Sequence, residues 1–151
     1  MNITNDKNLM ILSSIYGELM PEPHQVYHFV KGMVGFQAIR DFALLPYEDT
    51  PFYILHGTEG QTSFILLPAE QVQHYSFEID RSTAELLELT KPEDAVTLLV
   101  VNMDEGEISV NLRAPVLLHP ASQKGCQYVI HDQSVPLRYV LNKGGDHAAR
   151  T

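Results

Sequence analysis

The sequence predicts a mainly β protein, a single-domain small antiparallel β-barrel or β-sandwich with one short helix. Short runs rich in β-branched and aromatic residues recur along the chain, and turn residues separate most of them. Only one segment combines a helix start signal with an apolar stripe of helical spacing. A length of 151 residues favours one domain, which we place at residues 1–141.

The first expected strands lie in the N-terminal half of the chain. Gln25–Val30, Phe52–His56 and Ser63–Leu67 are rich in the β-branched and aromatic side chains that strands favour. Apolar and polar side chains alternate along Tyr75–Ile79, and this period of two is typical of a half-buried strand. Between the second and third runs, Gly57–Gly60 predicts a turn.

One helix is expected, over Ser82–Leu89. Ser82 and Glu85 fit a capping box, in which both side chains bind backbone amides of the first turn. Three leucines follow as a narrow apolar stripe, and the Lys91–Pro92 pair ends the helix. Pro92–Ala95 predicts one further turn.

The C-terminal half contains four expected strands, at Val96–Met103, Ile108–Leu112, Cys126–Ile130 and Leu137–Leu141. The first is an almost unbroken apolar run, typical of a central strand covered on both faces, and the second alternates with period two. Asp104–Gly106 and Lys124–Gly125 predict turns. The polar tail Asn142–Thr151 contains two adjacent glycines, and we expect it to be flexible.

The negative charge of the chain is concentrated in its middle. The whole chain has a formal net charge of −9, whereas residues 48–107 hold thirteen acidic residues and two basic ones, a net charge of −11. A surface of this sign repels phosphate, so direct nucleic-acid binding is disfavoured. The same surface would attract a basic partner and speed the encounter. A solvated face kept acidic for solubility accounts for the bias equally well.

No catalytic, metal or cofactor motif stands out. Neither the P-loop spacing nor the dinucleotide-binding glycine pattern occurs. Cys126 could pair with His119 or His131 as nucleophile and base. Cys126 and His131, however, should face opposite sides of one strand, and a buried structural cysteine is the favoured interpretation. His24 and His28 have the spacing of metal ligands on a helix but lie in or beside an expected strand. We therefore assign no catalytic residue, metal ligand or cofactor.

The apolar segments are short. The longest, Leu9–Leu12 and Leu98–Val101, are far below the roughly 18 residues that a membrane span needs. The first residues lack the charge pattern and cleavage site of a signal peptide. We expect a cytoplasmic protein that does not associate with membranes.

A recognisable pattern runs through six segments, Ile15–Leu19, Phe29–Phe36, Phe42–Pro46, Pro51–Leu55, Val110–Val116 and Gln127–Ile130. Their order and spacing resemble those of the FliW family of flagellar assembly factors, over about residues 15–141. Val30 and Val34 stand where family members usually have prolines, and His119 stands where they usually have asparagine.

The resemblance implies a cytoplasmic protein-binding regulator without catalytic residues. Such proteins bind flagellin and also bind and inhibit CsrA, an RNA-binding translational repressor. Relief of repression couples flagellin synthesis to flagellin export. The behaviour of the family favours binding beside the RNA site of CsrA, with a change in its conformation, over covering of that site. The alternative is a small-molecule-binding or enzymatic β-barrel whose site forms only in three dimensions.

The residues that match the family pattern have expected structural roles. Gly32 and Gly35 permit a turn with positive φ between Phe29 and Phe36, which we expect to anchor in the core. In the alternative, this loop is a contact surface. Asn111 is expected to bind backbone groups where Pro115 interrupts the strand ladder. Ala114 and Gln127 complete this set of motif residues.

Six acidic residues in expected turns are our candidates for contact with a basic partner: Glu48, Asp49, Glu59, Asp104, Glu105 and Glu107. All six are also ordinary turn residues, so a purely structural role accounts for their positions as well.

Overall fold

The structure is a computed structural model that describes residues 9–142 of the chain. Its strands are β1 (Ile11–Ser13), β2 (Gly17–Leu19), β3 (Val26–Phe29), β4 (Asp41–Pro46), β5 (Tyr53–Gly57), β6 (Ser63–Pro68), β7 (Val96–Asp104), β8 (Glu107–Val110), β9 (Val116–His119), β10 (Lys124–Gln127) and β11 (Tyr139–Asn142). Its helices are α1 (Arg81–Leu87) and the single 3₁₀ turns η2 (Pro23–Gln25), η3 (Ala69–Gln71) and η4 (Pro92–Asp94).

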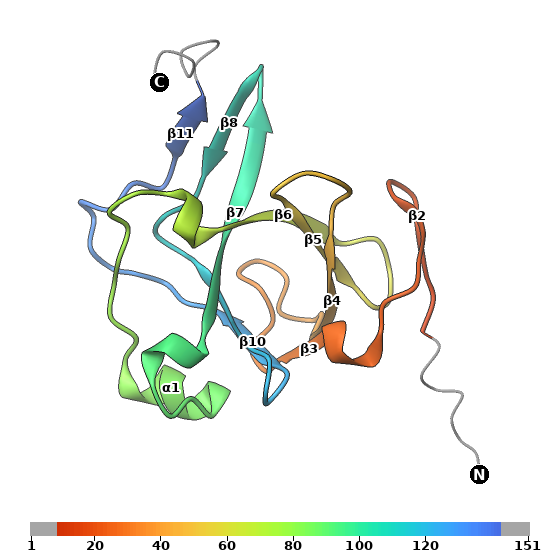
Figure 1. Ribbon diagram of the computed structural model, residues 1–151, viewed down its shortest axis with the longest axis horizontal. Coiled ribbons are helices and arrows are strands. Elements are labelled where there is room, and N and C mark those ends of the chain that lie inside the picture. Colours follow the sequence, from red (N-terminus) through yellow and green to blue (C-terminus); the bar gives the residue numbers. More distant parts are fainter. Residues whose placement is uncertain (1–8, 143–151) are drawn as a thin grey trace.

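Seven strands close into a barrel in the order β7-β6-β5-β4-β3-β10-β9, and β9 pairs with the first half of β7 to complete the circle. The β3–β10 pair is parallel, whereas the other barrel pairs are antiparallel. The second half of β7 leaves the barrel as a long hairpin with β8, and β11 lies beside β8 (Figure 1). The predicted mainly β barrel with one short helix is therefore confirmed.

The barrel interior is filled by inward-facing side chains from β3, β4, β5, β6, β7 and β9 and from the loop between β3 and β4. Phe29 and Phe42 are fully buried and contact each other edge to face, with ring centroids 5.1 Å apart. A Cβ at Gly125 would lie 2.7 Å from both the Phe29 ring and a Leu118 methyl group. A glycine at this position therefore allows β10 to approach the aromatic core.

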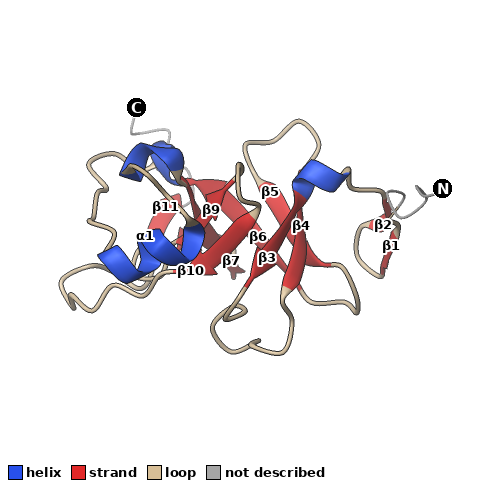
Figure 2. Cartoon of the chain, turned by 90° about the horizontal axis from the view of Figure 1, so that it is seen from below, coloured by secondary structure: helices blue, strands red, loops and turns tan. Residues whose placement is uncertain are grey.

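Two structures cover the outside of the barrel at opposite ends of the molecule (Figure 2). Helix α1 packs over β9 and β10, where Leu87, Leu117 and Cys126 form a small buried cluster. The β1–β2 hairpin lies at the other end of the molecule, where the Gln61 side chain from the β5–β6 loop binds the backbone of both Leu12 and Ser14. A third apolar cluster lies between the outer face of β6 and β7 and the strands β8 and β11.

The strand expected at Tyr75–Ile79 is wrong, because residues 75–80 belong to no strand. The Tyr75 side chain packs against the β6–β8 cluster, and its hydroxyl donates to the Leu112 carbonyl at 2.6 Å. Phe77 and Ile79 pack against the cluster under α1. The segment thus alternates in burial while crossing between two clusters, without a ladder of backbone hydrogen bonds.

The helix begins earlier and ends earlier than its capping pattern predicts. Asp80, not Ser82, is the N-cap residue, and its carboxylate accepts a hydrogen bond from the Thr83 amide at 2.8 Å. The expected capping box is therefore wrong. The helix ends at Glu88, which adopts a left-handed conformation with φ of 62°, whereas the further turn at Pro92 is confirmed as η4.

Other strand boundaries also differ from expectation. Lys124 and Gly125 begin β10 instead of forming a turn, and the preceding Gln123 carries the positive φ of 58°. The sequence analysis missed β1, β2, β4 and β9 as strands. β7 is a central strand, but its end projects from the barrel, so Met103 is 61% exposed and not covered on both faces. β11 includes Asn142, which we had placed in the tail, and residues 143–151 lie outside the described residues.

Candidate protein-binding surfaces

The side chain of Gln127 joins two of the segments that carry the family pattern. Its oxygen accepts a hydrogen bond from the Val34 amide at 2.9 Å, and its nitrogen donates to the Ala114 carbonyl at 3.1 Å. Gly32 and Gly35 have φ of 68° and 86° in the loop that Gln127 holds. A Cβ at Gly32 would lie 2.6 Å from the Gln37 Cα, so this position requires glycine for space as well as for conformation.

The segment after β8 is held by side chains that bind its backbone. The side-chain oxygen of Asn111 (Oδ1) accepts a hydrogen bond from the Arg113 amide at 2.9 Å. The Arg113 guanidinium in turn donates to the backbone carbonyl of Val135 at 2.9 Å. The backbone carbonyl of Pro115 accepts from the Tyr128 amide. Asn111 and Gln127 thus bind backbone groups through their side chains, whereas Ala114 and Pro115 take part through their backbone carbonyls.

Phe36 does not anchor in the core, contrary to expectation. Its side chain is 43% exposed and contacts the edge of Phe64, with ring centroids 5.4 Å apart. Phe29, the other expected anchor, is fully buried. Phe64 itself packs against the barrel core and lies beside Phe42, so Phe36 covers the edge of this core and stays partly exposed.

The six acidic candidates lie in three separate loops and do not form one patch. Glu48 and Asp49 follow β4, whereas Glu59 follows β5, so the two groups lie at opposite ends of β5. The remaining three lie in the β7–β8 hairpin, which projects from the barrel (Figure 1). One partner can therefore contact the acidic residues of one loop without contacting those of the other two.

The β7–β8 hairpin is less negative than its sequence indicates. Glu105 and Gly106 form its two-residue turn, with φ of 53° and 85°, as the Asp104–Gly106 turn signal predicts. The Arg138 guanidinium lies 2.6 Å from a carboxylate oxygen of Glu107. Its hydrogen bond with Glu107, helped by the charges of Glu107 and Asp104, raises the pKa of Arg138. The ion pair offsets one of the three negative charges.

Acidic residues around α1, which were not among the candidates predicted from the sequence, form another exposed group. Residues 78–94 hold six acidic and two basic residues, and five of the acidic side chains are exposed: Glu78, Asp80, Glu85, Glu88 and Glu93. The signal that could have found them is the number of acidic residues in this segment, which exceeds the number in any single turn. The tertiary structure places the whole segment over the outside of β9 and β10.

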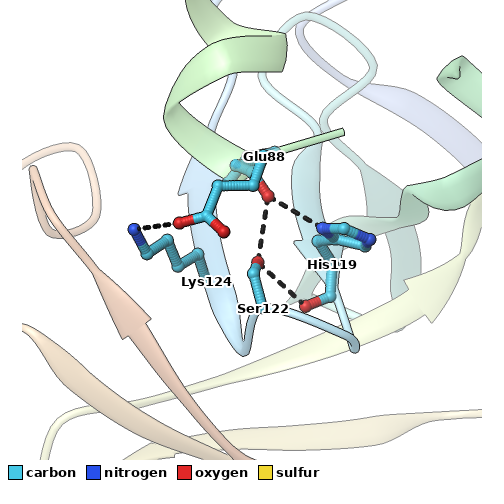
Figure 3. A network of polar contacts seen from close by, with 5 residues as sticks. Glu88, His119, Ser122 and Lys124 are labelled. Atoms are coloured by element: carbon cyan, nitrogen blue, oxygen red, sulfur yellow. Dashed lines mark hydrogen bonds and ion pairs between the residues drawn. The ribbon is translucent and has the colours of Figure 1, made fainter. Parts of the chain in front are cut away.

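A network of polar contacts attaches the end of α1 to the β9–β10 turn (Figure 3). The Leu87 carbonyl accepts hydrogen bonds from His119 Nδ1 at 2.8 Å and from Ser122 Oγ at 2.9 Å. Lys124 Nζ lies 2.7 Å from a Glu88 carboxylate oxygen, and this hydrogen bond and charge lower the pKa of Glu88. His119 and Ser122 bind the same carbonyl and do not bind each other through their side chains, so this is an anchor for the helix and not a nucleophile–base pair.

The side chain of Cys126 is buried, as expected of a structural cysteine. Cys126 is 6% exposed, and burial raises the pKa of its thiol to about 11. A protonated, buried thiol is a poor nucleophile at neutral pH. Among the described residues, no group of three or more histidine, cysteine, aspartate and glutamate side chains is arranged to hold a metal ion. No helix within residues 9–142 is long and apolar enough to cross a membrane.

Comparison with known proteins identifies the family. Residues 10–141 match the model of the FliW protein family, from β1 into β11. The chain belongs to the FliW family. This confirms the resemblance inferred from the sequence motifs and places the chain among flagellar assembly factors.

Individual FliW relatives cover most of the chain. The flagellar assembly factor FliW of Caldicellulosiruptor saccharolyticus is 30% identical over 136 residues, which are 87% of this chain and 90% of the relative. That of Syntrophus aciditrophicus is 33% identical over 75% of each chain, and that of Bacillus subtilis is 29% identical over 91% of this chain and 99% of its own. A crystal structure of the flagellar assembly factor FliW shares the fold, with a TM-score of 0.80, 23% identity and coverage of 89% of this chain and 98% of the other.

The barrel of this FliW-family chain is open at one end. A hollow of about 520 Å³ lies where β3, β5 and β7 begin and β6 and β9 end. Its lining includes the inward-facing Tyr27, Leu44, Tyr53 and Leu98, which belong to the barrel core or pack against it. We call this hollow the barrel mouth.

Proposed function

We propose that this chain acts in the cytoplasm as a protein-binding regulator that binds flagellin and antagonises the translational repressor CsrA. In this proposal, free flagellin occupies the protein, and its export releases the protein to inhibit CsrA and permit flagellin synthesis. The observation that carries the proposal is the FliW family match, which extends from β1 into β11.

The charge of the surface supports a basic client. A repressor that binds RNA needs a basic surface, and opposite charges steer two proteins together. The described structure exposes acidic side chains on and beside α1, in the β4–β5 loop and in the β7–β8 hairpin. We propose Glu48, Asp49, Glu59, Asp104, Glu105 and Glu107 as partner contacts, and the exposed acidic residues around α1 as a further candidate face.

A role without catalysis is part of the same proposal. The observations that favour it are the buried, protonated thiol of Cys126 and the engagement of His119 and Ser122 with one backbone carbonyl. Antagonism of CsrA then depends on contact alone. We propose that this contact lies beside the RNA site of CsrA and acts by changing its conformation.

The proposal is tested by measuring how much flagellin leader RNA is bound by purified CsrA in an electrophoretic mobility shift. Adding the protein should release the RNA, and adding purified flagellin should restore RNA binding. A plot of RNA affinity against protein concentration that reaches a plateau would support the conformational mechanism, because direct competition has no plateau. Unchanged RNA binding at saturating protein would contradict the antagonism.

A further inference from the structure

We propose that the barrel mouth is a docking site for one apolar side chain of a partner protein that carries lysine or arginine beside it. The inference deepens the proposed function, since it assumes a protein client. It names the part of the barrel that the client enters and the chemistry that the client must present there.

The inward-facing row of apolar side chains on β7 ends in an exposed valine at the mouth. Side chains two residues apart on a strand share a face, so Val96 continues the inward-facing row of Leu98 and Val100. Leu98 is 2% exposed, whereas Val96 is 42% exposed. Pro68 and Ala95 extend the apolar wall around it. A concave apolar site of this kind is where the central anchor residues of protein interfaces insert.

Acidic residues near the mouth favour basic residues beside the partner's apolar side chain, which we call the anchor. The lining includes Glu70 and contains no lysine or arginine. Glu93 and Asp94 directly precede the lining residue Ala95. The loop that leads to Tyr53 carries the exposed pair Glu48–Asp49. Charges within a Debye length of about 8 Å attract basic side chains at physiological salt, so an anchor flanked by lysine or arginine fits this rim.

Among the described residues, none of the buried side-chain polar atoms without a partner lies in the mouth, which favours a protein side chain over a small polar ligand. Small-ligand sites usually contain a few buried polar groups that fix the orientation of the ligand. Among the described residues, the buried side-chain atoms without a hydrogen-bond partner are His56 Nε2 and Ser109 Oγ. Neither residue lines the mouth, where the polar side chains of Tyr27, Tyr53, Thr97 and Glu70 lie among apolar ones.

The test compares two valines of nearly equal exposure. Val96→Arg places a cation in the mouth, and Val129→Arg is the matched control, since Val129 is 43% exposed and does not line the hollow. Binding of purified flagellin and purified CsrA is measured by calorimetry for the wild type and both variants, and thermal unfolding checks their folding. We expect Val96→Arg to weaken at least one client about 30-fold or more, as loss of an anchor does, with Val129→Arg within twofold. Val96→Thr, which keeps the shape, should give a smaller loss if Val96→Arg does not fold.

The outcomes separate this inference from the proposed function. If the wild type binds a client and both arginine variants bind equally well, or lose binding equally, the mouth is not the docking site and the inference is wrong. If the wild type binds neither client, the proposed function fails, and the mouth is judged by a probe peptide instead. That probe is acetyl-Lys-Lys-Leu-Lys-Lys-amide, with the alanine and the tetraglutamate versions as controls.

Amide chemical-shift changes report where the probe binds. Shifts that gather on residues of the mouth with the lysine–leucine peptide, and vanish with both controls, support the inference. Shifts that are absent or lie elsewhere overturn it. A small molecule that co-purifies in the mouth, detected by native mass spectrometry and lost in Val96→Arg, would also overturn it, because the occupant would then not be a protein side chain.

Discussion

The attachment of α1 to the barrel depends on one carbonyl with two donors, which gives a sharp prediction. The Leu87 carbonyl ends the helix and accepts from His119 Nδ1 and Ser122 Oγ at 2.8 and 2.9 Å. Leu87 itself is fully buried. Either donor alone satisfies the carbonyl, but removal of both leaves a buried acceptor without either of its side-chain donors.

The expected magnitudes follow from this geometry. Ser122→Ala should lower the free energy of unfolding by about 0.5–1.5 kcal/mol, the net value of one hydrogen bond. His119→Ala should cost more, because a buried ring is lost as well. The double variant should exceed the sum of the single variants by about 1 kcal/mol or more, since an unsatisfied buried group costs roughly 1–3 kcal/mol.

Urea unfolding of the four proteins, followed by circular dichroism, measures this coupling energy. The packing loss at His119 is present in both variants that lack the ring, so it cancels from the cycle. His119→Asn provides a control, because the asparagine side chain keeps a hydrogen-bond donor. An additive double variant would refute the reasoning, since another donor or water would then satisfy the carbonyl.

Three further predictions concern a core glycine, the buried cysteine and the charged β7–β8 hairpin. Gly125→Ala should lower the free energy of unfolding by about 1–3 kcal/mol in urea titrations, because its Cβ would lie 2.7 Å from the Phe29 ring. An unchanged urea midpoint would show that the neighbouring core side chains move to make room for the methyl group. Burial raises the pKa of the Cys126 thiol from 9.0 to about 11, so this thiol deprotonates at lower pH in the unfolded chain than in the folded one. The free energy of unfolding, measured by urea titration, should therefore fall as pH rises between these values. A constant free energy of unfolding would contradict the burial of the thiol. Replacing Asp104, Glu105 and Glu107 together by their amides should slow association with the proposed partner CsrA about two- to fivefold at low salt and less at high salt. Stopped flow measures the association rate of the wild type and the variant. If the two rates are equal and neither depends on salt, the interface lies elsewhere.

The local chemistry of the sequence determined the strands and turns whose signals depend only on neighbouring residues. β7 follows from an unbroken apolar run, and the β7–β8 turn follows from an Asp-Glu-Gly triplet in which glycine accepts a positive φ. The order of the motifs likewise identified the FliW family before any tertiary contact was considered.

Where a local signal had two structural solutions, tertiary contacts decided between them. Alternation along Tyr75–Ile79 is satisfied equally by a strand or by a segment that packs into two clusters in turn, and the clusters decided. Asp80 and Ser82 are both good N-cap residues, and the helix begins after Asp80, whose amide also donates to the Tyr128 hydroxyl at 3.2 Å. Phe36 has the hydrophobicity of a core residue, but the tertiary structure places it against Phe64 at the edge of the core, where it stays partly exposed.

The candidate sites depend on long-range pairing more than the fold class does. The parallel β3–β10 pair and the β7–β9 pair that closes the barrel join residues far apart in the chain, and neither leaves a local pattern in the sequence. These pairs create the barrel mouth and leave Val96 exposed in it. The sequence determined that the chain is acidic and β-rich, because charge and periodicity belong to neighbouring residues. Only the tertiary structure decided which charges surround an apolar hollow, because that arrangement comes from strands that meet across the closed barrel.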